Sequence, residues 1–546
     1  MKKSMTFVIS YFIGACLLAQ ATSTRLTEKP DSIAIYKVVL DGQSKIIPPT
    51  LPANKAYDEF LRLRWNFVKT KAPFSPGPAP RSEYPQYYFY CAFKDSGNVL
   101  LPDLWMNDVG EKLPNWFEST RLYYAYSGDI APLNIAKGMI DYSIDHGITP
   151  STYNWPNFPQ TGSNAGDMEF RGFSSAKRFA TDDVQVDHAG DIGATYYKMF
   201  LFYGDAKYKT AAINVANTLA GKIRPGNSTQ SPWPYVVNTK TGKIVSDYCS
   251  NWFGCITLFD CLIDAKIGNV KAYQDARAKA RDWILQYPMK NGVWVDGHTD
   301  NYITGTGNLS NMSASNAGLY LSDYRAFDPG WKIDLPGLIK WTEKNFIFHS
   351  APGEPGTQWG ANIVGEQLSF PYKMDYQTAR YAAQCARWYA LSGDTTFKEK
   401  AYRSLNWVTY CIDSTGKAFE SPLSKGILSW WSDSYGEGPR MFYHAFAAVP
   451  EWAPDGENHI LYSNKIIKDV SYQHEKVQYT ATVKKGTEYL RLAFKPAKIT
   501  INGIKISLVT DLDKDGYTLK NLQNEDYAVT INRLRMGEVV ISGSLN

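Results

Sequence analysis

The segment from Asp191 to Leu219, DIGATYYKMFLFYGDAKYKTAAINVANTL, predicts two helices joined by a tight turn. Apolar side chains between Ile192 and Tyr203 follow the three- and four-residue spacing of one helix face. Gly204 then supplies the left-handed conformation that ends a helix, and Asp205 caps the helix that follows. We therefore expect a helical hairpin here and compare the rest of the chain with it.

The same kind of turn recurs along the chain every 62 to 76 residues. It gives five hairpins, and a further helix is expected from about residue 435 to 448. An early helix over residues 55–69 would supply its partner. Twelve helices in six hairpins predict a mainly α fold, an (α/α)6 toroid, and an open solenoid of the same hairpins is the alternative. The turn glycines are Gly128, Gly204, Gly268, Gly330 and Gly393.

The segments that precede the first helix of each hairpin, here called the entry segments, share an unusual composition. Each is rich in carboxylates, amides and aromatic side chains, beyond what helix capping requires. If the first helices are the inner ones, the entry segments converge at one end of the ring and form a cleft suited to a polar polymer. The entry segments are residues 102–108, 181–191, 246–252, 296–302, 366–376 and 430–440.

The overall composition favours a carbohydrate ligand. The chain has 58 basic and 53 acidic residues, a net charge of +5, so no basic field points to nucleic acid. Aromatic residues make up 14% of the chain, with 16 Trp and 37 Tyr, which is more than a core needs. Trp and Tyr combine flat apolar faces with a polar group, and sugars present apolar C–H faces ringed by hydroxyls. We expect a carbohydrate substrate and no cofactor.

Together, the hairpin pattern over residues 50–450, the Gly-Asp turns and the Asp-rich segment 182–191 resemble the six-hairpin glycosidase-like superfamily. Its members include unsaturated glucuronyl hydrolases, related glucuronidases and several uronate polysaccharide lyases. The resemblance implies a carbohydrate substrate, often an acidic one, and leaves the reaction open. It carries over no catalytic residue.

Glycoside hydrolysis, the preferred function, needs two carboxyl groups that flank the bond, one protonated and one ionised. Four aspartates lie between residues 182 and 191, and clustered acids raise one another's pKa. We expect Asp183 or Asp187 as one member of the pair and Glu437 or Asp433 as the other. Asp187→Asn and Glu437→Gln should then each remove most activity with little change in melting temperature.

Two other functions remain open. A lyase acting on a uronate glycan by β-elimination would need a Tyr or His base and a group that neutralises the carboxylate. A non-catalytic carbohydrate-binding protein would need stacking aromatics and no carboxylate pair. The lyase candidates are Tyr435, Arg440 and His444, a second set of His298, Asn301 and Tyr302, and His188 beside the aspartates. The residues expected to contact substrate are Trp105, Asn251, Trp252, His298, Asn301, Tyr302, Glu366, Tyr372, Trp430, Trp431, Arg440 and His444.

The two ends of the chain differ from its helical middle, residues 22–454, which we expect to be the catalytic domain. Residues 1–21 predict a signal peptide, with two lysines, an apolar run and Ala19-Gln20-Ala21, so the protein is expected to be secreted or periplasmic. Lipidation at Cys16 is the alternative. No other stretch is apolar enough to cross a bilayer, so no integral membrane segment is expected after cleavage. The remaining cysteines show no metal-ligand spacing, and free thiols or at most one disulfide are expected.

Residues 455–546 predict an antiparallel β-sandwich of about eight strands. Asn502-Gly503 between two β-branched runs is a strong hairpin signal. Three alternating acids, Asp511, Asp513 and Asp515, match the start of a calcium loop. The twelfth position of that loop would be Leu522 and not Glu, so an acidic β-turn is the preferred interpretation.

Overall fold

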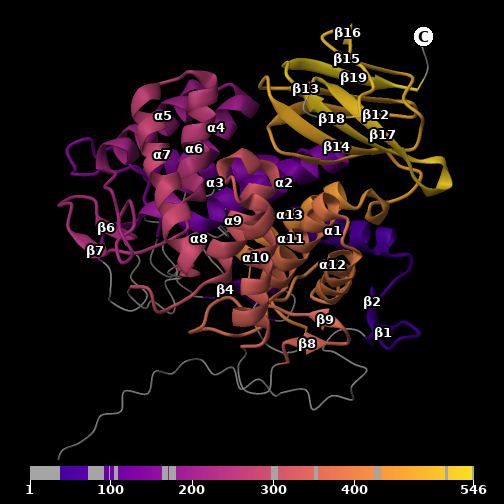
Figure 1. Cartoon of the computed structure of the whole chain (residues 1–546), viewed down its shortest axis with the longest axis horizontal. Helices are drawn as coiled ribbons and strands as arrows, with labels where there is room; N and C mark the ends of the chain where they lie inside the picture. The colour runs from indigo at the N-terminus through magenta and orange to yellow at the C-terminus, as the bar shows by residue number, and fades with distance from the viewer. Residues whose placement is uncertain are drawn as a thin grey trace, which may run out of the picture.

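The computed structural model describes residues 37–71, 92–96, 99–103, 109–162, 170, 180–296, 305–349, 355–422, 429–430, 432–510 and 514–543. The helices gather in one body, and the last nine strands of the described part lie beside it (Figure 1). Four short sheets complete the helical part: β1 (Val39–Leu40) with β2 (Ile46–Ile47); β3 (Ala92–Ser96), β4 (Val99–Asp103) and β10 (Ser429–Trp430); β5 (Asp183–Gln185), β6 (Val236–Asn238) and β7 (Ile244–Ser246); β8 (Thr357–Gln358) with β9 (Ala361–Asn362).

Five helical hairpins stand where the turns predict them. An earlier helix, α1 (Ala53–Thr70), and a later one, α13 (Gly438–Ala448), add to them, and a single-turn helix, α8 (Pro288–Asn291), follows the third hairpin. The hairpins are α2 (Val109–Ser127) with α3 (Ala131–His146), α4 (Val186–Tyr203) with α5 (Ala206–Lys222), α6 (Phe253–Ala265) with α7 (Val270–Gln286), α9 (Asn311–Asp323) with α10 (Trp331–Thr342), and α11 (Asp375–Ser392) with α12 (Thr395–Val408).

Four of the five predicted turn glycines adopt the left-handed conformation. Gly128, Gly204, Gly268 and Gly393 have φ between 73° and 78°. The prediction is wrong for Gly330, whose φ is −86°. There the chain leaves α9 through a short 3-10 helix, Arg325–Phe327, and Gly330 is the residue at which α10 begins, so no left-handed residue is needed.

The first helix of each hairpin is the inner one. In α2, α4, α9 and α11, buried side chains occur on all sides of the helix. In α5, α7 and α10, the buried side chains occupy a single face. Each of α2, α4, α6, α9, α11 and α13 contacts the next, and α13 contacts α2 again. The rings of Tyr57 and Phe60 from α1 pack on Phe442 of α13.

The N-terminal helix is also joined to α11 by a buried ion pair. Arg64 Nη2 lies 3.0 Å from Asp375 Oδ2, with neither side chain exposed. Arg64 also donates to the main-chain oxygen of Ser434, in the π-helical segment η5 (Ser432–Glu437) that leads into α13. One guanidinium therefore connects α1, α11 and the segment that leads into α13.

The C-terminal strands form two antiparallel sheets that enclose one hydrophobic core. Asn502 and Gly503 have φ of 49° and 75°, as a two-residue hairpin turn requires. The four-stranded sheet is ordered β11 (His459–Ser463), β14 (Gly486–Leu492), β18 (Tyr527–Arg533), β17 (Gly516–Asn521). The five-stranded sheet is ordered β12 (Ile467–Gln473), β13 (Lys476–Ala481), β19 (Gly537–Ser542), β15 (Lys498–Ile501), β16 (Ile504–Lys505).

The sheets pack against the C-terminal ends of inner helices. His459 of β11 stacks on Tyr126 at the end of α2, with ring centroids 4.1 Å apart. Tyr462 donates to Asp323, the last residue of α9, at 2.5 Å. This placement leaves the N-terminal ends of the inner helices, where the entry segments join, on the side away from the sheets (Figure 1).

Two further expectations can be compared with the described part of the chain. Its five cysteines are all free thiols, four of them buried. None of its helices combines the length and the apolar character that a membrane span requires.

Candidate active site

A cavity of about 180 Å³ lies among the N-terminal halves of the inner helices. All six inner helices contribute to its lining, which is predominantly polar or charged. Residues 181–191 and 430–440 thus meet at the same end of the molecule, as the convergence of the entry segments predicts. One contributor from each helix in chain order is Glu111, Asp191, Phe253, Asn316, Arg380 and Arg440.

Glu437 is held by two arginines in the wall of this cavity. Arg440 Nη2 lies 2.6 Å from Glu437 Oε1, and Arg380 forms a second ion pair with the same oxygen. Asn115 donates to the other oxygen at 3.2 Å. Burial alone would raise the pKa of Glu437, but the two guanidiniums more than offset this and lower it. The lowered pKa favours the carboxylate form of Glu437, which positions two arginines. An ionised carboxylate suits only the ionised member of a catalytic pair, so the assignment of Glu437 to that pair stays a prediction.

Asp191 is the carboxyl group whose surroundings suit an acid. It lines the cavity from α4, and burial raises its pKa from 3.8 to about 6. His188, Arg440 and Lys198 favour its ionised form, and they only partly offset the cost of burial. A Cβ atom at Gly254 of α6 would overlap the Asp191 carboxylate, so this glycine makes the space that the acid occupies.

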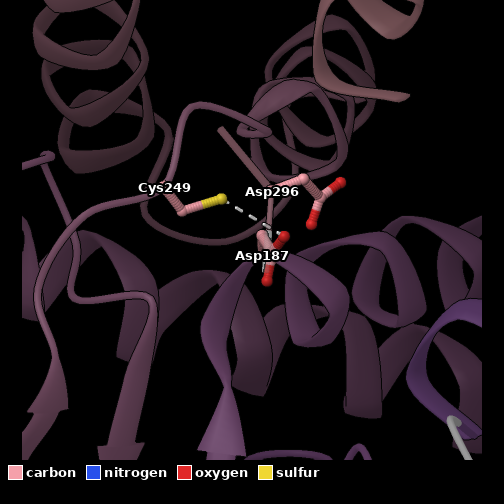
Figure 2. Close-up of side chains that lie close together, drawn as sticks. All are labelled: Asp187, Cys249 and Asp296. Atoms are coloured by element: carbon pink, nitrogen blue, oxygen red, sulfur yellow. Dashed lines mark hydrogen bonds between the residues drawn. The ribbon is translucent and has the colours of Figure 1, made fainter. Parts of the chain in front are cut away.

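Asp187 lies one helical turn earlier, beside a second carboxylate and a thiol (Figure 2). It is fully buried, and burial raises its pKa to about 7, with Asp296 adding to the rise and His188 opposing it. Cys249 Sγ lies 3.4 Å from Asp187 Oδ2. His188 lines the cavity, and its Nε2 lies 3.8 Å from the same carboxylate.

A chain of side-chain amides connects this group to the arginines. Asn251 donates to Asp296 Oδ2 at 3.3 Å and accepts from Asn316 at 2.9 Å. Asn316 in turn accepts from Arg380 at 2.9 Å. The predicted contact Asn251 therefore does line the cavity, and it orients an amide network across α6, α9 and α11.

A second group of charged side chains, from α2 and α4, also lines the cavity. Glu118 accepts from Lys198 at 2.5 Å and pairs with Arg121 at 2.5 Å. Burial would raise the pKa of Glu118, but these two cations lower it far below its ordinary value. Glu118 is thus a fixed anion, and Lys198 brings a positive charge to the cavity.

Several predicted residues lie in the described structure away from the cavity lining. Asp183 accepts from the Ala180 N–H at 2.7 Å and from Asn238 at 2.9 Å, which stabilises a local turn. Trp252 is buried and donates to the Cys249 carbonyl at 2.8 Å. Glu366 is buried and accepts from the Tyr376 hydroxyl at 2.6 Å, whereas Tyr372 is 43% exposed.

The first lyase set is not brought together. The Tyr435 hydroxyl accepts from the Ala418 N–H at 2.7 Å and donates to the Gly416 carbonyl at 3.0 Å. His444 faces the C-terminal sheets, with its ring 4.5 Å from that of Tyr462. Only Arg440 of the three lines the cavity. Their spacing in the sequence predicted that these three residues lie close together. In the structure, their side chains point to different sides of η5 and α13.

Other predicted site residues lie outside the described residues. They are Trp105, His298, Asn301, Tyr302 and Trp431. Asp433 and Trp430 belong to η5 and β10, and their side chains are likewise outside the description. Of the three acids in the C-terminal loop, Asp515 is described: it accepts from the Leu534 N–H at 3.0 Å and pairs with Arg535 at 2.8 Å, while Asp511 and Asp513 are not.

Sequence reasoning missed several cavity residues. Glu111, Lys198 and Arg380 lie inside helices, outside the entry segments from which the site was predicted. Arg380 carried a usable signal, because a charged residue within an Ala-rich buried helix needs a partner. Nothing in the sequence marked Glu111 or Lys198 as a cavity residue, because charged residues in helices usually face solvent.

Comparison with known proteins gives matches of structure alone. The chain is similar to cellobiose 2-epimerase from Spirochaeta thermophila, with a TM-score of 0.53 and 11% identity over 73% of this chain and 96% of that one. A family 76 glycoside hydrolase from a bovine Bacteroides thetaiotaomicron strain gives a TM-score of 0.46 and 10% identity over 73% and 78%. Unsaturated glucuronyl hydrolase from Bacillus sp. GL1 gives 0.41 and 10% over 74% and 99%.

No protein-family model and no curated protein sequence matches this chain. At these identities the likeness establishes the fold and leaves the activity to the chemistry of the site. The paired helices, their order of contact and the structural likeness agree with one another. By its fold, the chain is similar to cellobiose 2-epimerase, and this likeness agrees with the predicted resemblance to the six-hairpin glycosidase-like superfamily.

Proposed function

We propose that the chain is a secreted glycoside hydrolase that acts on a uronic-acid-containing glycan in the cavity among the inner helices. The single observation that carries the proposal is Asp191, a carboxyl group with a pKa of about 6 in a cavity lined by all six inner helices. A glycosidase needs an acid with a raised pKa to donate a proton to the leaving oxygen. The predicted signal peptide supports secretion.

The architecture belongs to the same proposal. The contact of α13 with α2 and the packing of α1 on α13 support a closed (α/α)6 toroid over an open solenoid. The two C-terminal sheets with their shared core support a β-sandwich that braces the end of the toroid opposite the entry segments. A closed ring would hold the six first turns rigidly around one substrate.

Glu111 is the proposed partner of Asp191. It lines the same cavity from the first turn of α2. A Cβ atom at the neighbouring Gly110 would meet Cβ of His188, so the beginnings of α2 and α4 are in close contact. This juxtaposition places one carboxyl group from each helix on the cavity, as hydrolysis requires.

The positive charges favour an acidic sugar. Arg380 and Arg440 both pair with the carboxylate of Glu437, so two guanidinium groups lie at the cavity wall. Arg440 Nε is buried and has no hydrogen-bond partner among the described residues. A uronate carboxylate would accept from such a donor, because guanidinium groups bind carboxylates with matched geometry.

Proton-transfer chemistry is the second candidate. His188 lines the cavity, and an imidazole is a suitable base for removing a proton adjacent to a carbonyl or carboxylate. A lyase and an epimerase both begin with this step, and the structural neighbour with the TM-score of 0.53 is a cellobiose 2-epimerase. A protein that only binds carbohydrate remains the third candidate.

One experiment separates these candidates. Uronate-containing oligosaccharides are incubated with the protein in water enriched in ¹⁸O and, separately, in D₂O, with mass detection of products. Hydrolysis adds one ¹⁸O atom at each cut. A lyase shortens the chain without ¹⁸O and creates ultraviolet absorbance, and an epimerase adds deuterium without shortening. Absence of all three changes across acidic and neutral glycans contradicts an enzyme.

Variants then test the assignment. Asp191→Asn and Glu111→Gln should each lower kcat by at least about 100-fold. The matched control is Asp205→Asn, which replaces the exposed cap of α5 with an equally good cap and should keep full activity. The alkaline limb of the wild-type pH–rate profile should fall near pH 6, where Asp191 loses its proton. Full activity in Asp191→Asn would refute the assignment.

A further inference from the structure

Asp187, Cys249 and Asp296 form a compact buried group outside the cavity lining (Figure 2). A carboxylate oxygen from each aspartate and the Cys249 sulfur lie within 4.8 Å of one another. None of the three residues is exposed. Asp187 belongs to the first turn of α4, Cys249 lies just before α6, and Asp296 lies in the connection between α8 and α9.

The carboxyl groups of Asp187 and Asp296 accept few hydrogen bonds. Asp187 Oδ1 and Asp296 Oδ1 are buried and have no hydrogen-bond partner within the described part of the chain. The Cys249 thiol donates to the other oxygen of Asp187, and the Asn251 amide donates to the other oxygen of Asp296. The main-chain N–H of His188 also favours the ionised form of Asp187. Ionised carboxylates buried with so few donors are costly unless a cation compensates them.

The neighbouring protein cations do not supply that compensation. Among the described residues, no lysine or arginine forms an ion pair with Asp187 or Asp296. His188 Nε2 lies 3.8 Å from Asp187 Oδ2, and the imidazole carries a positive charge only when it is protonated. Two carboxyl groups and a sulfur therefore lie close together, with no lysine or arginine paired to them among the described residues.

We propose that Asp187, Cys249 and Asp296 bind one divalent metal ion of the Zn²⁺ type. A thiolate with two carboxylates is a ligand set that Zn²⁺ accepts, whereas Mg²⁺ and Ca²⁺ avoid sulfur. Ligand atoms of a tetrahedral zinc site stand roughly 3.5 Å apart. The 3.4 Å between Cys249 Sγ and Asp187 Oδ2 matches that spacing. Three protein ligands leave the fourth position to water.

The ion would tie together the first turn of α4, the residues just before α6 and the connection between α8 and α9. Asn251 and His188 line the cavity and contact Asp296 and Asp187, so they connect the metal site with it. Binding would require Cys249 to lose its proton, which makes the affinity rise with pH. The inference does not depend on which reaction the cavity performs.

The test measures the metal directly on the full-length protein. After removal of metals with a chelator, the protein is titrated with Zn²⁺ and, separately, with Co²⁺. We expect one equivalent of either ion, a higher melting temperature, and a near-ultraviolet sulfur-to-cobalt charge-transfer band. Cys249→Ser should abolish that band and weaken Zn²⁺ binding at least about tenfold.

The matched control is Cys385→Ser, which removes another buried thiol, from α11, and should leave the band and the stoichiometry unchanged. Asp296→Asn serves as a second variant in case Cys249→Ser does not fold, and it should weaken Zn²⁺ binding while keeping the thiolate band at saturating Co²⁺. The absence of stoichiometric Zn²⁺ and Co²⁺ binding would overturn the proposal. So would a charge-transfer band that survives in Cys249→Ser. Neither measurement uses activity, so failure here is distinct from failure of the proposed hydrolase.

Discussion

The carboxylate of Glu437 and the guanidinium of Arg440 form an ion pair of 2.6 Å at the beginning of α13, and Glu437 has no exposed surface. Because Arg380 shares the same carboxylate oxygen, the anion serves two cations from two helices. A glutamate held in this way is a positioning residue for the arginines. This relationship revises the expectation that the melting temperature would tolerate its replacement.

Replacement of Glu437 should therefore destabilise the protein. Glu437→Gln keeps the shape but leaves the buried Arg380 and the partly buried Arg440 without their anion. Breaking a buried ion pair costs about 3–5 kcal/mol. The free energy of unfolding, measured in urea, checks this. The control Glu399→Gln removes a partly exposed carboxylate from α12 and should cost less than about 1 kcal/mol. Equal stability of Glu437→Gln and wild type would contradict the ion-pair interpretation.

Asp191 should make stability depend on pH in a particular direction. Its pKa is raised from 3.8 to about 6 in the folded protein, so the folded state binds the proton more tightly than the unfolded state. The contribution of Asp191 to the free energy of unfolding is greatest below pH 4 and is lost as the pH rises towards 6. Asp191→Asn cannot ionise, so its stability relative to wild type should increase between pH 4 and 6 and stay constant above. Urea unfolding at several pH values measures this difference, and a pH-independent difference would exclude the raised pKa.

Gly254 should be irreplaceable because of its neighbour. In Gly254→Ala the added methyl group would overlap the Asp191 carboxylate and approach the main-chain nitrogen of α4. We expect loss of most activity together with a lower melting temperature. Gly337→Ala in α10 is the control, since nothing lies within 4 Å of the added atom there. Alanine in that helix should stabilise by about 0.5–1 kcal/mol. A fully active Gly254→Ala protein would show that α4 and α6 are not packed as described.

The Arg64–Asp375 pair should stabilise the attachment of α1. Arg64→Met leaves Asp375 buried without its cation, at a cost of about 3–5 kcal/mol. The double variant Arg64→Met/Asp375→Asn should lose less than the sum of the two single variants, because each single change leaves a charge unpaired. Arg62→Met, two residues earlier at a half-exposed side chain, should cost less than about 1 kcal/mol. Additive losses would mean that the two charges do not interact.

Local patterns in the chain were enough to predict the repeating unit. Glycine at 128, 204 and 393 ends a helix for a reason that acts within a few residues: glycine reaches the left-handed conformation with the least strain. At the third turn, Lys266 ends α6 in that conformation, and Gly268 follows two residues later. The aspartates at 205 and 394 cap the next helix for an equally local reason. The strands of the tail and the Asn502-Gly503 turn were predictable on the same ground, since alternation and turn chemistry are properties of short segments. The predicted left-handed conformation of Gly330 was wrong because the chain already reverses direction in a 3-10 helix before this residue. No short sequence pattern indicates that 3-10 helix.

The tertiary structure decided which of these residues do chemistry. Asp183 and Asp187 are four residues apart, yet one stabilises a turn and the other lies buried beside Cys249 and Asp296. Glu437 was chosen from its sequence for its carboxylate, and packing against Arg380, 57 residues earlier, made it a fixed anion. The pKa of a carboxyl group and its ion-pair partners depend on burial and on charged residues from distant parts of the chain. A short stretch of sequence contains no information about either. The sequence alone determined the hairpins and the end at which their polar residues gather, and only the folded arrangement of the inner helices decided which carboxyl group keeps its proton.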